Sequence, residues 1–395
     1  MRIRPYRAEH AEQAFQLRVT AFSGATHVEY DADEIYIPDE HRLVAVDDGE
    51  VVGHLGVWPF NQAFHRHAVP MGGVGAVVVA DHRRGEGIAT RLLEAGLAHM
   101  ADAGMAISTL YPSTPVPYRR WGWAYAGVRM RRRIATRDLL DVPPAVTHVT
   151  LRPYAASDLD AVVAVHDAVT TTEPGGLVCG TRWLQRALQP DPDDPEIAHV
   201  AVRDHRVVGL LLLAKTAPSE AHGSYDVDVL RLFGVDRDVE RALWRAVAHH
   251  HTTAPRTAFV SRPADPLLFD LRHGLEMTDP STAHFMTRLV DVQAAIGARG
   301  WPPGSATVHL DIVDPQHPTN AGRYVLELDD RTAVLTAGGT GRVTIDIAVL
   351  SSLYTGFLTA TDAARDGRLP GATTADVIAL TDAFAGPTPF LRDFF

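Results

Sequence analysis

Residues 77–93 read VVVADHRRGEGIATRLL, and this stretch decides the fold of the chain. Val77–Val79 are apolar and β-branched, which predicts a buried strand. A basic, glycine-rich turn follows, and then Ile88, Leu92 and Leu93 recur at the spacing of one helix face. Glycines let a ligand approach the backbone, and the free N–H groups and dipole at a helix start attract anions such as pyrophosphate. The stretch therefore predicts a strand–turn–helix unit with an anion site at the turn.

Two pairs of segments repeat along the chain. Residues 3–12 and 151–160 each predict a short strand with a Pro-Tyr exit and then an amphipathic helix. Residues 43–53 and 199–209 each predict a β-hairpin with a polar turn. The two offsets are 148 and 156 residues, so both pairs keep nearly the same spacing. A duplicated domain explains this better than coincidence does.

The region after about Met286 has no third copy of these segments. It begins with the Pro/Gly-rich stretch 300–304. Alternating residues then predict strands at 308–312, 324–328 and 342–347, and helices follow around 348–354 and 374–385. This part of the chain predicts a separate α+β module.

The turn after Val79 matches neither the Walker P-loop, which needs Gly-Lys-Ser/Thr, nor the dinucleotide motif G-x-G-x-x-G. A plain strand–turn–helix junction with solvated arginines is the alternative. The pattern Arg84-x-x-Gly87-x-Ala89, directly after the strand, resembles the signature by which GNAT-superfamily N-acetyltransferases hold the pyrophosphate of coenzyme A. This resemblance favours a functional turn over a plain junction.

A second motif follows the strand predicted at residues 106–111. Residues 118–123 read YRRWGW, which resembles the GNAT segment in which a tyrosine contacts the thioester sulfur. More narrowly, the three-part order of the whole chain is similar to the enhanced intracellular survival (Eis) family of acetyltransferases. The resemblance implies an α/β and α+β fold: tandem GNAT domains, the second degenerate, and then a sterol-carrier-protein-like α+β domain. The expected boundaries are 1–145, 146–285 and 286–395.

The same resemblance implies the role of each matching residue. Tyr118 would act as the general acid, and the carboxylate of Phe395, the last residue given, as the base. Acetyl-CoA would be the cosubstrate. The residues expected to bind it are Val77 and Val79 along the strand, Arg83, Arg84, Gly85, Gly87, Ile88 and Ala89 in the turn, and Ser113 after the next strand. Glu86 departs from the pattern, because family members often carry further arginines here, and it is expected to weaken phosphate affinity.

An acidic cluster follows the first predicted helix. Its members Glu29, Asp31, Asp33 and Glu34 correspond to a region that lines an acidic cleft in the Eis family, suited to polyamines such as aminoglycosides. A solvated, helix-capping loop explains the acids equally well. Phe22 and Trp58 could be aromatic residues of the same cleft, but core packing is favoured for both.

The second copy lacks the glycine pair. Residues 233–241 read FGVDRDVER, so acids stand where pyrophosphate would lie. We expect that this copy does not bind coenzyme A.

Composition excludes several function classes. The net charge of −11 repels phosphate backbones and argues against nucleic acid as a partner. The longest apolar run, 207–214, falls far below the roughly 20 residues that cross a membrane. The single cysteine, Cys179, excludes an internal disulfide and, with no signal peptide seen, favours the cytoplasm. Cys179 is expected to be packed, His249–His251 to be a surface run, and no metal is expected.

The predicted function is acetyl-CoA-dependent N-acetylation of a small polycationic amine such as an aminoglycoside. The resemblance also implies a homo-oligomer, a hexamer in that family. Two alternatives remain: acetylation of lysine in a protein or peptide, and a lipid or small-ligand binding protein whose GNAT domain is regulatory.

Overall fold

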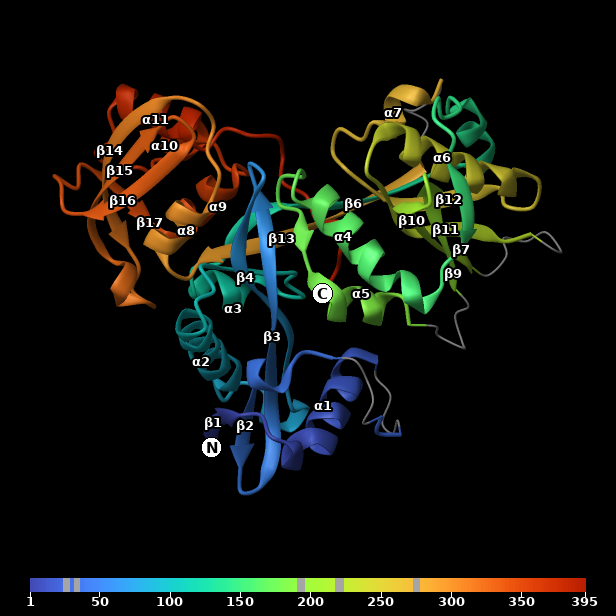
Figure 1. Ribbon diagram of the computed structural model, residues 1–395. Helices are drawn as coiled ribbons and strands as arrows, with labels where there is room; N and C mark the ends of the chain where they lie inside the picture. Colours follow the sequence, from blue (N-terminus) through green and yellow to red (C-terminus); the bar gives the residue numbers. More distant parts are fainter. Residues whose placement is uncertain (24–28, 32–35, 190–195, 217–223, 273–277) are drawn as a thin grey trace. The chain divides into compact units, whose positions relative to one another are not determined.

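The computed structural model describes residues 1–23, 29–31, 36–189, 196–216, 224–272 and 278–395. The chain forms two compact units (Figure 1). Unit 1 consists of residues 1–127, 284–389 and 394–395, and unit 2 of residues 128–283 and 390–393. The boundaries at 145/146 and 285/286 remain predictions, because unit 1 holds both the N-terminal and the C-terminal part of the chain.

A mixed sheet forms the N-terminal part of unit 1. The strands β1 (Arg2–Pro5), β2 (Arg42–Asp47), β3 (Glu50–Phe64) and β4 (His67–Val79) pair antiparallel in this order. Beyond β4, β5 (Ile107–Leu110) runs parallel to it, and the end of β13 (Thr278–Leu289) pairs antiparallel with β5. The predicted strand at 77–79 is thus the end of β4.

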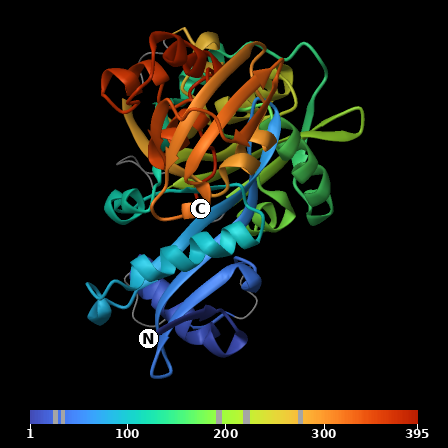
Figure 2. The same ribbon diagram turned by 90° about the vertical axis from the view of Figure 1, so that its left-hand side faces the viewer.

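Helices cover both faces of this sheet. Along β2, Leu43 and Ala45 pack with the helix α2 (Ile88–Asp102), and Val44 between them packs with α1 (Ala11–Ser23). Successive strand residues point to opposite faces, which explains the alternation. Figure 2 shows α2, in cyan, lying across the strands. The predicted strand–turn–helix unit is confirmed.

The C-terminal part of unit 1 is the predicted α+β module. Its sheet has the order β16 (Thr332–Ala337), β15 (Gly322–Asp329), β14 (Ser305–Val313) and β17 (Val343–Asp346). The helices are α8 (Val292–Ala298), α9 (Ile347–Thr355), α10 (Ala360–Arg365) and α11 (Thr374–Ala383). Alternate residues of β14 are buried, as the sequence pattern predicts.

Unit 2 repeats the strand order of the N-terminal sheet. The strands β7 (Thr150–Pro153), β9 (Glu196–Arg203), β10 (Arg206–Thr216) and β11 (Asp226–Gly234) pair antiparallel, and β12 (Arg256–Ser261) runs parallel to β11. The helices α4 (Leu159–Thr170) and α6 (Arg237–Ala248) pack in separate apolar clusters of this sheet. The second part of β6 (Ala124–Ala135) adds an antiparallel strand beside β12. The recurring order and directions agree with a duplicated domain.

The arginine-rich stretch 129–137 lies mostly in β6, which extends to Ala135. Within the part of the chain that the structure describes, no helix combines the length and apolar character needed to cross a membrane.

Candidate active site

One cavity in unit 1 brings most of the predicted site residues together. Its volume is about 580 Å³. The end of β4 and the start of α2 form part of its wall, and the short helix α3 (Pro115–Arg120) contributes Tyr118. The lining contains these predicted residues: Phe22, Val77, Val79, Arg83, Arg84, Gly85, Gly87, Ile88, Ala89, Ser113 and Tyr118.

The turn before α2 is open toward this cavity. Gly85 and Gly87 have φ angles of +88° and +76°, a region that side chains disfavour. A Cβ added at either glycine would meet no described atom within 4 Å. No described side chain caps the first turn of α2. Its N–H groups are thus available to an anion, and the helix dipole strengthens that interaction.

A β-bulge breaks the pairing of β4 just before Val77. His54 faces Val78 and Gly56 faces Gly75, so β4 holds one extra residue in this interval. Ala76 has a φ of +50°, which is unusual for a residue with a side chain. A bulge redirects the strand and interrupts its ladder, so the end of β4 can present backbone groups to a ligand.

His54 holds this bulge from the neighbouring strand. The Arg42 Nε–H donates to Nε2 of His54 at 3.2 Å, so the imidazole proton must be on Nδ1. Nδ1 lies 3.1 Å from the carbonyl oxygen of Ala76 and donates to it. Burial, assisted by the Arg42 charge, lowers the pKa of His54 to about 3, which keeps the ring neutral. His54 carries no signal in the sequence, because only the strand register brings it to the bulge.

The two arginines of the turn already have carboxylate partners. Arg83 pairs with Glu86 and with Asp47, each at 2.8 Å. The hydrogen bonds that Arg83 donates to Glu86 and Asp47 raise the pKa of Arg83, and the one to Glu86 lowers the pKa of Glu86. Arg84 pairs with Asp81 at 2.9 Å, and both side chains are exposed. A phosphate would have to compete with these carboxylates for the guanidinium groups.

Tyr118 has the surroundings of a proton donor. Burial raises the pKa of Tyr118, so its phenol is protonated at neutral pH. Its ring packs edge-on against Trp123, with the ring centroids 6.3 Å apart. The predicted tyrosine therefore lines the same cavity as the glycine turn, in its protonated form.

Phe395 lies beside β4, before the bulge. A Cβ added at Gly73 would be 3.0 Å from a ring carbon of Phe395, and one added at Gly75 would be 3.8 Å from its carboxyl carbon. The ring also packs edge-on against Phe60 and Tyr111, at centroid distances of 5.3 and 5.9 Å. The glycines of β4 thus leave room for this residue.

The predicted substrate residues divide into three groups. Phe22, at the end of α1, lines the cavity and is 61% exposed, which favours a cleft position over core packing. Glu29 and Asp31 are exposed and flank Tyr30, whose ring packs against Phe15 of α1 at 5.5 Å, but neither acid lines the cavity. Asp33 and Glu34 lie outside the described residues. Trp58 is buried, in agreement with the predicted core packing.

Two family models match separate parts of the chain. The acetyltransferase (GNAT) domain matches residues 2–126, and the sterol carrier protein domain matches residues 292–392. The chain therefore contains a GNAT acetyltransferase domain. No functionally curated protein matches its sequence.

Solved structures resemble this acetyltransferase over its whole length. A GCN5-related N-acetyltransferase from Kribbella flavida is 27% identical, with a TM-score of 0.85 over 100% of this chain and 98% of that one. A GCN5-related N-acetyltransferase from Anabaena variabilis ATCC 29413 is 24% identical, with a TM-score of 0.89 over 100% of both chains. Eis1 from Mycobacterium abscessus is 22% identical, with a TM-score of 0.84, also over 100% of both. The last two, being less identical, support the fold alone.

The GNAT fold implies the use of acetyl-CoA, and the acetyltransferase cavity fits that molecule. Gly85 and Gly87 leave the space that a pyrophosphate needs beside the N-terminus of α2. The bulge at Ala76 interrupts the ladder at the end of β4, where backbone groups would pair with the elongated arm of the cosubstrate. Once bound there, acetyl-CoA supplies an activated acetyl thioester.

The second copy differs at the corresponding turn. The Asp236 side chain accepts a hydrogen bond from the Val239 N–H at 3.0 Å and caps α6. Asp236 also pairs with Arg203 at 2.7 Å. A capped, negatively charged helix start disfavours a second anion, which supports the expectation that this copy does not bind coenzyme A.

Proposed function

We propose that this acetyltransferase transfers an acetyl group from acetyl-CoA to an amine of a small polycationic substrate such as an aminoglycoside. The observation that carries the proposal is the single cavity that joins the open turn at Gly85 and Gly87 to the phenol of Tyr118. Binding the cosubstrate at the turn aims its thioester along the end of β4. Holding the two reactants in this geometry is expected to contribute most of the rate acceleration.

Tyr118 acts as the general acid in this proposal. The amine nitrogen forms a bond to the acetyl carbon while the bond from that carbon to sulfur breaks. The phenol of Tyr118 donates its proton to the departing sulfur, and the amine loses one proton to a base. The raised pKa of Tyr118 supports a donor role, because the phenol stays protonated at neutral pH.

The base in this proposal is the carboxylate of Phe395, in a chain that ends at this residue. Its carboxyl carbon lies beside Gly75, two residues before Val77 on the same strand. The packing of its ring on Phe60 and Tyr111 fixes the position of the residue. A carboxylate there would attract a cationic amine and accept its proton, directly or through water.

The charge of the chain supports a cationic substrate. The net charge is −11, and the exposed acids Glu29 and Asp31 lie beside α1, whose end contributes Phe22 to the cavity. Acidic surroundings concentrate cations near a site and raise their association rate. We propose that these acids, together with Asp33, attract the polyamine.

The first test is an acetyl-transfer assay over a panel of aminoglycosides, polyamines and lysine peptides, with mass detection of each product. Tyr118→Phe should lower kcat on the order of a hundredfold or more and leave acetyl-CoA binding unchanged. Tyr125→Phe is the matched control, because Tyr125 lies outside this cavity. Full activity of Tyr118→Phe would exclude the acid role, and turnover of lysine peptides alone would exclude the polyamine substrate.

A second pair of variants tests the base. One added glycine after Phe395 keeps the ring but moves the carboxylate, and deletion of Phe395 removes both. Both variants should lose most of their turnover if the carboxylate is the base. If only the deletion loses activity, the residue serves through its ring and the base lies elsewhere.

Resemblance to the Eis family alone leads us to propose a hexamer in the cytoplasm. Light scattering of the purified chain tests the assembly, and a single-chain mass would exclude it.

A further inference from the structure

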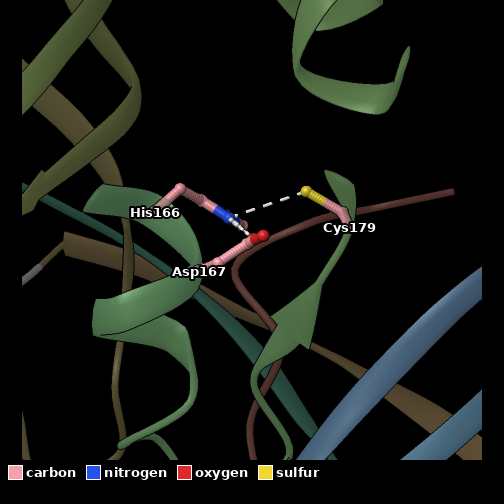
Figure 3. Close-up of side chains that lie close together, drawn as sticks. All are labelled: His166, Asp167 and Cys179. Carbon is pink, nitrogen blue, oxygen red and sulfur yellow. Dashed lines mark hydrogen bonds and ion pairs between the residues drawn. The ribbon is translucent and has the colours of Figure 1, made fainter. Parts of the chain in front are cut away.

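Three potential metal ligands meet in unit 2, and none of them lines the cavity described above (Figure 3). His166 and Asp167 are neighbours on α4, and Cys179 directly precedes α5 (Gly180–Ala187). Nδ1 of His166 lies 3.1 Å from a carboxylate oxygen of Asp167 and 3.6 Å from the sulfur of Cys179. Among the described residues, this is the one group of three such side chains that could surround an ion.

The spacing of these atoms suits a tetrahedral ion. Zinc lies about 2.3 Å from thiolate sulfur and about 2.0 Å from imidazole nitrogen, which places the two ligand atoms about 3.5 Å apart in a tetrahedron. The nitrogen–sulfur distance here is 3.6 Å. One ring nitrogen of His166 faces both partners, so an ion bound to that nitrogen would lie beside the other two ligand atoms (Figure 3). The cluster thus has the form of a preformed three-ligand site.

The other nitrogen of His166 gives an independent indication. Its Nε2 has no hydrogen-bond partner among the described residues, although the side chain is only 1% exposed. The nearest carboxylate is that of Asp393, whose oxygen lies 3.8 Å away. Asp393 is held by Arg231 and by the indole N–H of Trp183. A metal-bound histidine commonly turns its second N–H toward such a carboxylate.

We propose that His166, Asp167 and Cys179 form a binding site for one zinc-like divalent cation. Thiolate, imidazole and carboxylate together are a donor set typical of zinc. The thiolate and the carboxylate balance the two charges of the ion, and the thiol proton of Cys179 leaves to solvent on binding. Asp167 is 29% exposed and provides a path for entry.

The position of the site assigns it a structural role. The ion would join α4 to the start of α5. Through Nε2 of His166 it would also order Asp393, which is two residues from Phe395 in the sequence. In this role the metal stabilises unit 2 and touches no acetyl group.

Cobalt binding to the full chain tests the site directly. Because Cys179 is the only cysteine in the sequence, any thiolate-to-cobalt charge-transfer band must come from it. After removal of metal with a chelator, we expect one Co²⁺ per chain with this band, displaced by one equivalent of Zn²⁺. Zinc should also slow the reaction of Cys179 with a thiol reagent at least about tenfold and raise the melting temperature.

Matched variants distinguish metal binding at this site from metal binding by other histidines. Cys179→Ser should abolish the band, and Asp167→Asn, at a partly exposed position, should keep the fold and weaken zinc binding at least about tenfold. His249→Gln is the control and should change neither result. The proposal would be overturned if the wild type showed no band with excess cobalt. It would also be overturned if Cys179→Ser still bound cobalt and His249→Gln did not. None of these readouts depends on acetyl transfer.

Discussion

Among single residues, His54 links the stability of the protein to pH. The folded state holds its pKa at about 3, well below the ordinary value of 6.5. Between these two pKa values the imidazole of His54 is protonated in the unfolded chain and neutral in the folded chain. Stability from this group is therefore complete above pH 6.5 and is lost as the pH falls toward 3, by about 1.4 kcal/mol for each pH unit.

Replacing His54 by asparagine removes this titration. The asparagine amide can still donate to the Ala76 carbonyl, as Nδ1 does in the wild type. Urea unfolding between pH 7.5 and pH 4 should give a free energy of unfolding that depends less steeply on pH in His54→Asn. Equal slopes in the two proteins would contradict the assigned protonation state.

Residue type and spacing predicted some of these residues and not others. The glycines of the turn and Tyr118 belong to local motifs, so the sequence identified them. His54 and His166 carry no local motif: the first reaches Ala76 through strand register, and the second meets Cys179 thirteen positions away through the turn between α4 and α5. Asp47 reaches Arg83 from the β2–β3 hairpin, again through register. Contacts of this kind depend on the folded chain.

At the scale of elements, two glycines at the ends of α2 allow the effect of backbone strain to be measured apart from the effect on ligand binding. Gly87 has a φ of +76° at the start of α2, and Gly104 has a φ of +71° just after its end. Neither glycine has a described atom within 4 Å of an added Cβ. Alanine at either position should therefore lower stability by a similar amount, on the order of 1 kcal/mol.

Only the first of these substitutions should affect acetyl-CoA. Gly87 lines the cavity and Gly104 does not. We expect Gly87→Ala to weaken acetyl-CoA binding on the order of tenfold, about 1.4 kcal/mol, while Gly104→Ala binds as the wild type does. Calorimetric titration measures both, and equal affinities would show that the turn does not hold the pyrophosphate.

The same turn contains a carboxylate that competes with phosphate. Glu86 binds the guanidinium of Arg83, which a phosphate would otherwise contact. Glu86→Gln keeps the shape and removes the charge. Because exposed ion pairs are weak, acetyl-CoA should bind only up to about fivefold more tightly, with the gain shrinking at high salt. Weaker binding in Glu86→Gln would mean that Glu86 positions Arg83 for the ligand instead of competing with it.

The periodicity of the sequence predicted which segments form helices and strands, but it did not predict irregularities within them, such as bulges. The alternating segments became β14 and β15, and the helix after the glycine turn became α2. The sequence carries no signal for the bulge at Ala76, because alanine does not favour a positive φ and its residue type therefore does not predict this conformation. Gly122 belongs to the aromatic motif, but close packing also requires a glycine at this position, because an added Cβ would lie 2.2 Å from Nη1 of Arg288.

For the molecule as a whole, one buried ion pair joins β13, which pairs with the sheet of the acetyltransferase domain, to the sterol-carrier-like domain within unit 1. Arg288 is on β13, which pairs with β5, and Asp314 follows β14. The guanidinium donates to both carboxylate oxygens at 2.9 and 3.0 Å, and both side chains are 0% exposed. Burial lowers the pKa of Arg288, so the charge there depends on its partner.

Breaking this pair should destabilise both domains together. The loss of stability should differ between a variant of Asp314 and a variant of Arg288. Asp314→Asn leaves a buried guanidinium without a carboxylate, which costs about 3–5 kcal/mol. Arg288→Met should cost less, because Asp314 still accepts hydrogen bonds from Asn320 at 3.0 Å and from the His317 N–H at 3.1 Å. Hydrogen exchange should report loss of protection in β13 and β14 at the same denaturant concentration. If β14 opens first, or if Arg288→Met costs more, the two domains are not coupled through this pair.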